Sequence, residues 1–325
     1  MAEALLEVSD LSVRFDTEEG PVHAVDGLSF TLAPGEVLGI VGESGCGKSA
    51  SCLSLVRLLP ETAAISGSVL LAGVDLLALP ARELRRVRAR EISYVFQEPL
   101  TALNPVFTVG SQIGEVLTKQ MGLSRRDARA RTIELLRLVH IPAPESRLDA
   151  YPHQLSGGMR QRVVIAMALA CDPKVLIADE PTTALDVTIQ AGILDLLRDI
   201  RERLGTAIVL ITHNLGVVAD VADRVLVMYA GRKAEEAPTL ELFAAPQHPY
   251  TIGLLAAIPR VHGPGEERSR LQEIPGRIPS LRELPSGCAF APRCPRADVT
   301  DCTHKPEPRS VRRGHLVACF HPGAV

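Results

Sequence analysis

The chain has 325 residues, which is enough for two domains or for one large domain with an appendage. Hydrophobic residues make up 46% of the chain, which excludes a largely disordered protein. Its 35 Lys and Arg residues nearly balance 38 Asp and Glu residues, and only 3% of residues are aromatic, so nucleic acid is not an expected partner.

The apolar stretches are too short to form a membrane-spanning helix. The longest of them, residues 163–171, falls well below the about 18 residues that such a helix needs. The acidic N-terminus lacks the apolar segment of a secretory signal. We therefore expect a chain on the cytoplasmic side that reaches the membrane only through its partners.

The first third of the chain alternates strand-like and helical patterns. Strand patterns occupy residues 5–41, 66–74 and 92–96, and helical patterns occupy 50–59 and 82–90. Residues 98–172 have helical patterns only, which predicts a helical insertion.

The same alternation returns after the insertion. Apolar strands are expected at 174–179, 207–212 and 224–229, with helices at 187–203 and 214–222. This order predicts an α/β fold with a mostly parallel sheet. Short helices are expected at 239–244 and 249–257, and the Pro- and Gly-rich residues 259–295 should hold little regular structure.

Residues 42–49 read GESGCGKS and lie between a strand and a helix. They fit the phosphate-loop pattern G-x-x-x-x-G-K-[ST], in which glycines let backbone N–H groups converge on phosphate oxygens. Lys48 is expected to bind the β- and γ-phosphates of ATP, and Ser49 to bind Mg²⁺.

Cys46 lies inside this loop, next to the N-terminus of the following helix. A helix N-terminus lowers a thiol pKa, so we expect alkylation of Cys46 to block ATP binding and ATP to protect the thiol. The alternative is a small residue tolerated at a variable position.

A second acidic motif ends the apolar strand at 174–179. Asp179 is placed to hold Mg²⁺ through water, and Glu180 follows at the carboxyl end of the strand, where ligands of α/β sheets bind. A carboxylate there can polarise a water molecule for attack on the γ-phosphate.

Ser156, Gly157 and Gly158 precede a long helical run and form a second anion site at a helix N-terminus. One ATP has one γ-phosphate, so we expect this site to serve the nucleotide of a neighbouring chain. With this motif the sequence resembles the ATP-binding-cassette (ABC) ATPases over residues 5–258.

The resemblance implies a core like that of RecA with an antiparallel β subdomain and a helical subdomain at about 98–172. It implies that Gln97 contacts Mg²⁺ and the attacking water, that His213 donates to the γ-phosphate and that Asp186 joins two sites at a dimer interface. The implied nucleotide contacts are Phe15, Gly42, Ser44, Gly45, Cys46, Gly47, Lys48, Ser49, Ala50, Gln97, Ser156, Gly157, Gly158 and Asp186.

The C-terminal segments HPYTIGLLAAIPR and GCAFAPRCP resemble the C-terminal region of dipeptide/oligopeptide importer ATPases. We expect an ATP-binding domain at 1–237 and this C-terminal region at 238–325.

The resemblance implies two membrane permease subunits, a second and non-identical cassette, and indirect contact with a solute-binding protein. An importer ATPase for nickel or another small solute and a soluble ABC ATPase outside transport are the alternatives.

Four of the seven cysteines lie within residues 288–319: Cys288, Cys294, Cys302 and Cys319. Their spacing lacks the close pairs of structural zinc sites, whereas four thiolates in a loop-rich segment suit a [4Fe–4S] cluster. The resemblance also implies a cluster, because some members carry one. Zinc, free or oxidised cysteines, and ligation by His304, His315 or His321 are the alternatives.

Overall fold

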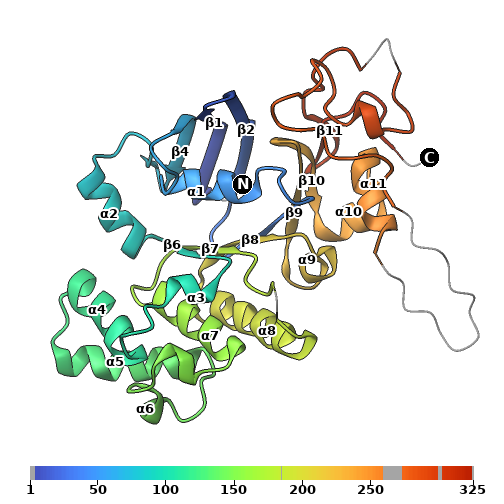
Figure 1. Ribbon diagram of the computed structural model, residues 1–325. Helices are drawn as coiled ribbons and strands as arrows, with labels where there is room; N and C mark the ends of the chain where they lie inside the picture. Colours follow the sequence, from blue (N-terminus) through green and yellow to red (C-terminus); the bar gives the residue numbers. More distant parts are fainter. Residues whose placement is uncertain (1–3, 184, 259–272, 299–301, 324–325) are drawn as a thin grey trace, which may run out of the picture. The chain divides into compact units, whose positions relative to one another are not determined.

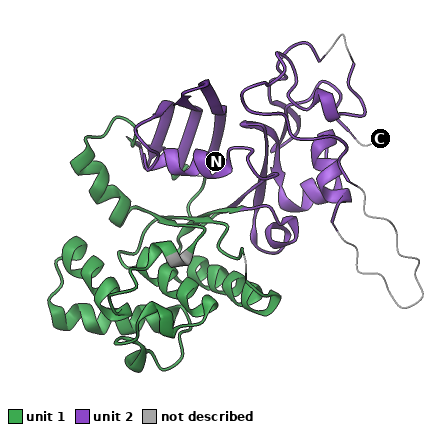
Figure 2. Cartoon of the chain, in the orientation of Figure 1, with its two compact units in different colours: residues 1–5, 32–37, 75–211 green, residues 6–31, 38–74, 212–325 purple. Residues whose placement is uncertain are grey.

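The computed structural model describes residues 4–183, 185–258, 273–298 and 302–323 (Figure 1). Two compact units divide the chain, and each is assembled from separate stretches of sequence (Figure 2). Unit 1 comprises residues 1–5, 32–37 and 75–211, and unit 2 comprises residues 6–31, 38–74 and 212–325.

Three parallel strands form the sheet portion of unit 1. Strand β7 (Val175–Asp179) pairs with β6 (Ile92–Val95) on one side and with β8 (Ala207–Thr212) on the other. Every residue of β7 and β8 is buried, as continuous apolar runs in a parallel sheet require.

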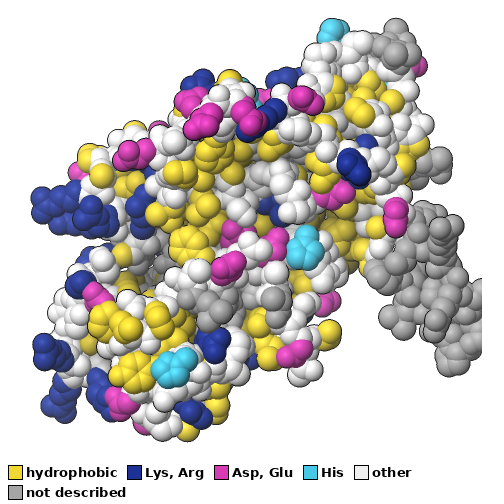
Figure 3. Space-filling view, in the orientation of Figure 1, with side chains coloured by type: hydrophobic (Ala, Val, Ile, Leu, Met, Phe, Trp, Pro, Cys, Tyr) yellow, Lys and Arg dark blue, Asp and Glu magenta, His cyan; other side chains and the backbone are white. Residues whose placement is uncertain are grey.

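Between β6 and β7 the described chain is helical, as the sequence predicts. The helices of unit 1 are α2 (Ala81–Arg90), α3 (Pro99–Ala102), α4 (Val109–Met121), α5 (Arg125–Leu138), α6 (Pro144–Arg147), η1 (Pro152–Gln154), α7 (Gly157–Ala168) and α8 (Val187–Leu204). Thr108 caps α4 and Ser124 caps α5, and Gly122 and Gly205 end α4 and α8 in the left-handed conformation. Figure 3 shows the arginines of α2 as a dark blue group on the surface.

Unit 2 contains a second, antiparallel group of strands. The order in this sheet is β2 (Gly20–Leu32), β1 (Leu6–Thr17), β4 (Ala63–Leu71) and β5 (Val74–Asp75). Strands β1 and β4 are antiparallel, with Val8 opposite Val69 and Phe15 opposite Ala63.

The other strands of unit 2 run in both directions. Strand β3 (Val37–Val41) pairs in parallel with β9 (Arg224–Tyr229), and β9 pairs antiparallel with β10 (Arg232–Pro238). Strands β12 (His315–Val317) and β11 (Arg309–Arg312) then extend the antiparallel part. The strands predicted at 174–179, 207–212 and 224–229 therefore form parallel pairs as expected. The sheet is mixed because β10, β11 and β12, which the sequence did not predict, add antiparallel pairs.

The helices of unit 2 are α1 (Lys48–Leu55), α9 (Leu215–Val221), α10 (Thr239–Ala244), α11 (Pro249–Ala256) and η2 (Ala291–Arg293). None of the described helices of the chain is both long and apolar enough to cross a membrane.

A hydrophobic cluster joins the C-terminal residues to the strands of unit 2. Its aromatic centre consists of Tyr229 on β9, Tyr250 on α11 and Phe290, with ring centroids 4.6–5.5 Å apart. The rings meet edge to face or tilted, which is the favourable arrangement for aromatic side chains. Val41 and buried residues between 215 and 290 therefore share one core in unit 2.

Buried polar contacts hold the last strands in place. The fully buried ring of His315 on β12 contacts Glu235 on β10 through Nε2 at 2.6 Å and Glu241 on α10 through Nδ1 at 3.1 Å. Glu235 also accepts hydrogen bonds from the backbone N–H groups of Gln247 and His248. These contacts give His315 a structural role in place of the metal ligation that the sequence left open.

His248 supplies a test of this packing. It is 3% exposed, and its Nδ1 accepts the Tyr250 N–H at 3.0 Å. Burial lowers the pKa of His248 from 6.5 to about 4. Between these values the unfolded chain binds the additional proton, so the free energy of unfolding should fall as the pH decreases.

We expect His248→Asn, which keeps an acceptor, to reduce the slope of unfolding free energy against pH between about 6.5 and 4. Urea unfolding at a series of pH values measures the slope. The exposed His153→Asn is the control and should leave it unchanged. An unchanged slope in the His248 variant would show that this histidine is not buried in its neutral form.

Candidate nucleotide-binding site

The turn between β3 and α1 leaves no room for side chains at two of its glycines. A Cβ atom at Gly42 would lie 2.3 Å from the Met228 carbonyl oxygen, and one at Gly47 would lie 2.3 Å from that of Ala24. Gly47 also has a φ of 99°, which favours glycine. The strand, turn and helix have the order that a phosphate loop requires.

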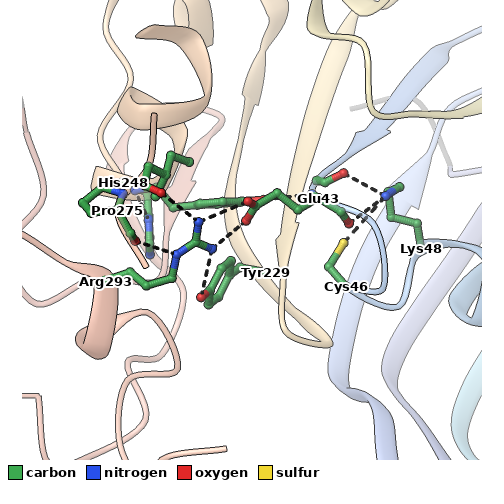
Figure 4. A network of polar contacts seen from close by, with 10 residues as sticks. Glu43, Cys46, Lys48, Tyr229, His248, Pro275 and Arg293 are labelled. Carbon is green, nitrogen blue, oxygen red and sulfur yellow. Dashed lines mark hydrogen bonds and ion pairs between the residues drawn. The ribbon is translucent and has the colours of Figure 1, made fainter. Parts of the chain in front are cut away.

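Lys48 bends back over this turn (Figure 4). Its Nζ donates to the Gly42 carbonyl at 2.8 Å and to the Glu43 carbonyl at 3.0 Å, and the residue is 5% exposed. Backbone carbonyls of the loop therefore hold the ammonium group inside the turn. Ser44, Gly45, Ser49 and Ala50 are the other predicted contacts from this stretch, and all are exposed or partly exposed.

The expectation that the pKa of Cys46 is lowered was wrong. Cys46 is 1% exposed, and burial raises the pKa of its thiol despite the nearby Lys48, whose Nζ lies 3.9 Å from Sγ. Desolvation of the thiolate raises the pKa by more than the helix N-terminus and the Lys48 ammonium group lower it. Both burial and the raised pKa oppose alkylation, so the thiol is poorly suited as a reactive group in this conformation.

In unit 1 the predicted carboxylates end strand β7. Asp179 is 5% exposed and accepts a hydrogen bond from the Tyr94 hydroxyl on β6 at 2.7 Å. Glu180 has a φ of 46°, and its N–H donates to the Ile211 carbonyl on β8. A non-glycine residue in the left-handed region is uncommon, and such residues are concentrated at functional sites.

The structure brings Gln97 and Glu180 together. Gln97 Nε2 donates to Glu180 Oε2 at 3.1 Å, and the Thr183 hydroxyl donates to the same oxygen at 2.7 Å. Two side-chain donors therefore orient one carboxylate oxygen of the predicted base.

Two of the predicted interface residues are helix caps. The Ser156 hydroxyl accepts the Met159 N–H at the start of α7, and Asp186 accepts the Ile189 N–H at the start of α8. A Cβ atom at Gly158 would lie 2.6 Å from Ile189, so a glycine there permits α7 and α8 to approach closely. Both caps, with Gly157, are exposed.

The remaining predicted contacts belong to unit 2. Phe15 is half-buried on β1, and His213 is exposed directly after β8. Asn214 follows and caps α9 by accepting the Gly216 N–H at 3.0 Å.

Sequence reasoning missed the side chains that support these groups. Tyr94 and Thr183 contact the carboxylates, and Tyr250 and Arg293 contact Glu43 of the loop. Tyr94 and Thr183 each lie three residues from a predicted site residue in the sequence, so this closeness could have identified them. Tyr250 and Arg293 are distant in sequence from the phosphate loop, and no sequence pattern pointed to them.

The four clustered cysteines all lie in unit 2. Burial raises the pKa of Cys288, of Cys294 and of Cys319, the last to about 11. The Cys319 thiol is also influenced by the charges of the other three. Among the described residues, no three His, Cys, Asp or Glu side chains lie close enough together to hold one metal ion.

Comparisons with known proteins identify the class of protein. The family model described as "ABC transporter" matches residues 25–183, and the one described as "Oligopeptide/dipeptide transporter, C-terminal region" matches residues 234–302. Among solved structures, the ATP-binding cassette MJ0796 bound to ADP and Pi is 28% identical with a TM-score of 0.65, covering 72% of this chain and 98% of that one. Clostridium perfringens cbiO1, part of the ABC transporter complex cbiONQ, is 31% identical with a TM-score of 0.64, covering 74% and 91%.

Two curated relatives match over nearly the full length. The "Probable peptide ABC transporter ATP-binding protein y4tR" of Sinorhizobium fredii is 52% identical over 100% of this chain and 97% of its own. The "Oligopeptide transport ATP-binding protein OppD" of Salmonella typhimurium is 51% identical over 99% and 95%. The chain therefore belongs to the ATP-binding proteins of the ABC transporter family and is an ATPase of the ABC type.

Glu180→Gln should lower ATP turnover by about 10²–10⁴-fold if Glu180 is the carboxylate that polarises the attacking water, as the sequence predicts. ATP binding should persist. Turnover is measured by phosphate release from the assembled complex, and binding by a fluorescent ATP analogue. Glu202→Gln on the exposed end of α8 is the matched control. Undiminished turnover in the Glu180 variant would remove this residue from the catalytic step.

Proposed function

We propose that this chain is the ATP-hydrolysing subunit of an importer for dipeptides or oligopeptides. The match of residues 234–302 to the C-terminal region of oligopeptide/dipeptide transporters carries the proposal, because that region lies outside residues 25–183, which match the general ABC transporter model. The full-length identity to peptide-import relatives supports it.

In this proposal two cassettes bind two MgATP molecules between them. Lys48 and the backbone N–H groups of the phosphate loop bind the phosphates, and Ser49 with Asp179 holds Mg²⁺. The Ser156 loop of the neighbouring cassette completes each site, and its helix N-terminus favours the γ-phosphate. Glu180, oriented by Gln97 and Thr183, positions the water.

Closure of the cassette pair would move two membrane permease subunits. Gln97 supports this coupling because it lies between β6 and the helices α3 to α7, so a change in its contact with Glu180 reaches the start of the helical segment. The chain would work at the cytoplasmic face of the membrane, held there by the permeases. A related, non-identical cassette is the proposed partner.

The proposed domain boundary lies near residue 238, with residues 1–237 binding ATP.

We propose that Cys288, Cys294, Cys302 and Cys319 bind a [4Fe–4S] cluster that stabilises the C-terminal region. Backbone N–H groups of Arg296 and His321 donate to the sulfurs of Cys294 and Cys319 at 3.4 and 3.3 Å. These bonds partly offset the burial that raises the pKa of both thiols, and they would stabilise the thiolates that a cluster requires.

Replacing both Cys288 and Cys302 by Ser should remove iron and acid-labile sulfide from chain purified without oxygen, and should lower the melting temperature. Cys171→Ser, in unit 1, is the control and should keep both. Zinc in place of iron would overturn the cluster, and wild-type chain without any metal would overturn ligation altogether.

The importer proposal is tested by affinity purification of the chain from solubilised membranes of its own cell, with co-purifying chains identified by mass spectrometry. We expect two polytopic membrane proteins and a second cassette, and a captured solute-binding protein that binds peptides. A solute-binding protein specific for nickel would replace the peptide substrate. Recovery without membrane proteins would contradict transport and leave the ATPase.

A further inference from the structure

Glu43 of the phosphate loop forms an ion pair with Arg293, which lies between Cys288 and Cys294 in the sequence. Arg293 donates to both carboxylate oxygens of Glu43, at 2.8 and 3.1 Å (Figure 4). This fork-like pairing is the strongest geometry for an arginine and a carboxylate. The Arg293 side chain is only 3% exposed, and that of Glu43 is 27% exposed.

The position of Arg293 is fixed independently of Glu43. Its Nε donates to the Pro275 carbonyl at 3.1 Å, and its guanidinium carbon lies 5.8 Å from the centre of the Tyr229 ring. A Cβ atom at Gly276 would lie 3.3 Å from Arg293 Cγ, so the chain around 275 closely covers the side chain. The C-terminal residues therefore present a preset cation to the loop.

Tyr250 gives the loop a second contact with the same aromatic cluster. The Glu43 N–H donates to the Tyr250 hydroxyl at 2.9 Å, and Tyr250 is fully buried on α11. Because Tyr250 packs against Tyr229 and Phe290, its hydroxyl cannot move without disturbing the core. Both the backbone and the side chain of Glu43 are thus held by residues after the predicted boundary at 238.

These contacts bear on ATP through charge and through loop shape. The Glu43 carbonyl accepts from Lys48, so moving Glu43 also moves the phosphate-binding lysine. Without a cation beside it, the Glu43 carboxylate would repel the triphosphate that the loop binds. Removing one member of a largely buried ion pair leaves its partner uncompensated, which is the costly case.

We propose that Arg293 is a positioning residue of the ATP site: it neutralises and holds Glu43, and through this ion pair the C-terminal region sets the affinity of the phosphate loop for ATP. Arg293 does not touch the nucleotide. The proposal depends on ATP binding by the loop and is independent of which solute the transporter carries.

The experiment compares four full-length chains: wild type, Arg293→Met, Glu43→Gln and the double variant. The readouts are the dissociation constants of MgATP and of adenosine, measured by calorimetry. Arg293→Met should weaken MgATP binding about tenfold and leave adenosine binding unchanged, because adenosine carries no phosphate. Adding Glu43→Gln should restore MgATP binding to within about twofold, because it removes the unpaired carboxylate.

Salt and a control variant separate charge from packing. The loss of MgATP affinity in Arg293→Met should become smaller when the ionic strength rises from about 0.05 to about 0.5 M, because salt screens the repulsion between Glu43 and the triphosphate. Arg309→Met is the matched control: Arg309 is exposed and donates to the Phe320 carbonyl, so MgATP affinity should not change.

Two results would overturn the proposal: unchanged MgATP affinity in Arg293→Met, or a loss that Glu43→Gln does not restore. If the Arg293 variant fails to fold, the MgATP affinity of Glu43→Gln alone tests the proposal. It should keep or tighten MgATP binding, whereas a loss of tenfold or more would show that the carboxylate itself is needed.

Discussion

The phosphate loop depends on close contact between backbones at two points where no side chain intervenes. Gly42 lies against the carbonyl of Met228 on β9, and Gly47 against that of Ala24 on β2. The Gly231 N–H donates to the Cys46 carbonyl at 2.9 Å, which ties the loop to the turn after β9. The loop thus has a rigid base on two strands, and this base lets Lys48 fold back over the turn.

The strand that supports the loop also supports the C-terminal residues. Tyr229 follows Met228 on β9, and it packs against Tyr250, Phe290 and Arg293. A boundary drawn from composition separates residues that share one hydrophobic cluster. Because core packing is dense, we expect a change in this cluster to affect the loop.

In unit 1, hydrogen bonds hold the predicted site residues in place. Glu180 occupies an uncommon backbone conformation, and its carboxylate is oriented by Gln97 and Thr183. Residues in sparsely populated conformations persist only where their surroundings hold them. Buried Asp179, bound by the Tyr94 hydroxyl, gives the end of β7 a second fixed carboxylate. The predicted base is therefore held in one orientation by its neighbours, and such positioning is a main contribution to phosphoryl transfer.

Residue patterns were sufficient to predict the elements and motifs that depend on local physics. Strands β8 and β9 and helix α10 begin and end at the predicted residues 207–212, 224–229 and 239–244. The phosphate loop and the Asp179–Glu180 pair were readable because their chemistry requires contiguous residues of particular types. The other features depend on contacts between residues that are distant in the sequence. Strand β10 was not predicted because its buried Glu235 and Glu236 break the apolar pattern, and β11 and β12 are too short to show one.

The pKa of Cys46 and the partner of Glu43 were equally beyond local reasoning. A helix N-terminus argued for a reactive thiol, but the depth of burial set the direction of the shift. Arg293 lies 250 residues from Glu43, and neither residue carries a periodicity or spacing that relates it to the other. Local patterns report what a residue can do, whereas desolvation and ion pairing depend on what the folded chain places beside it.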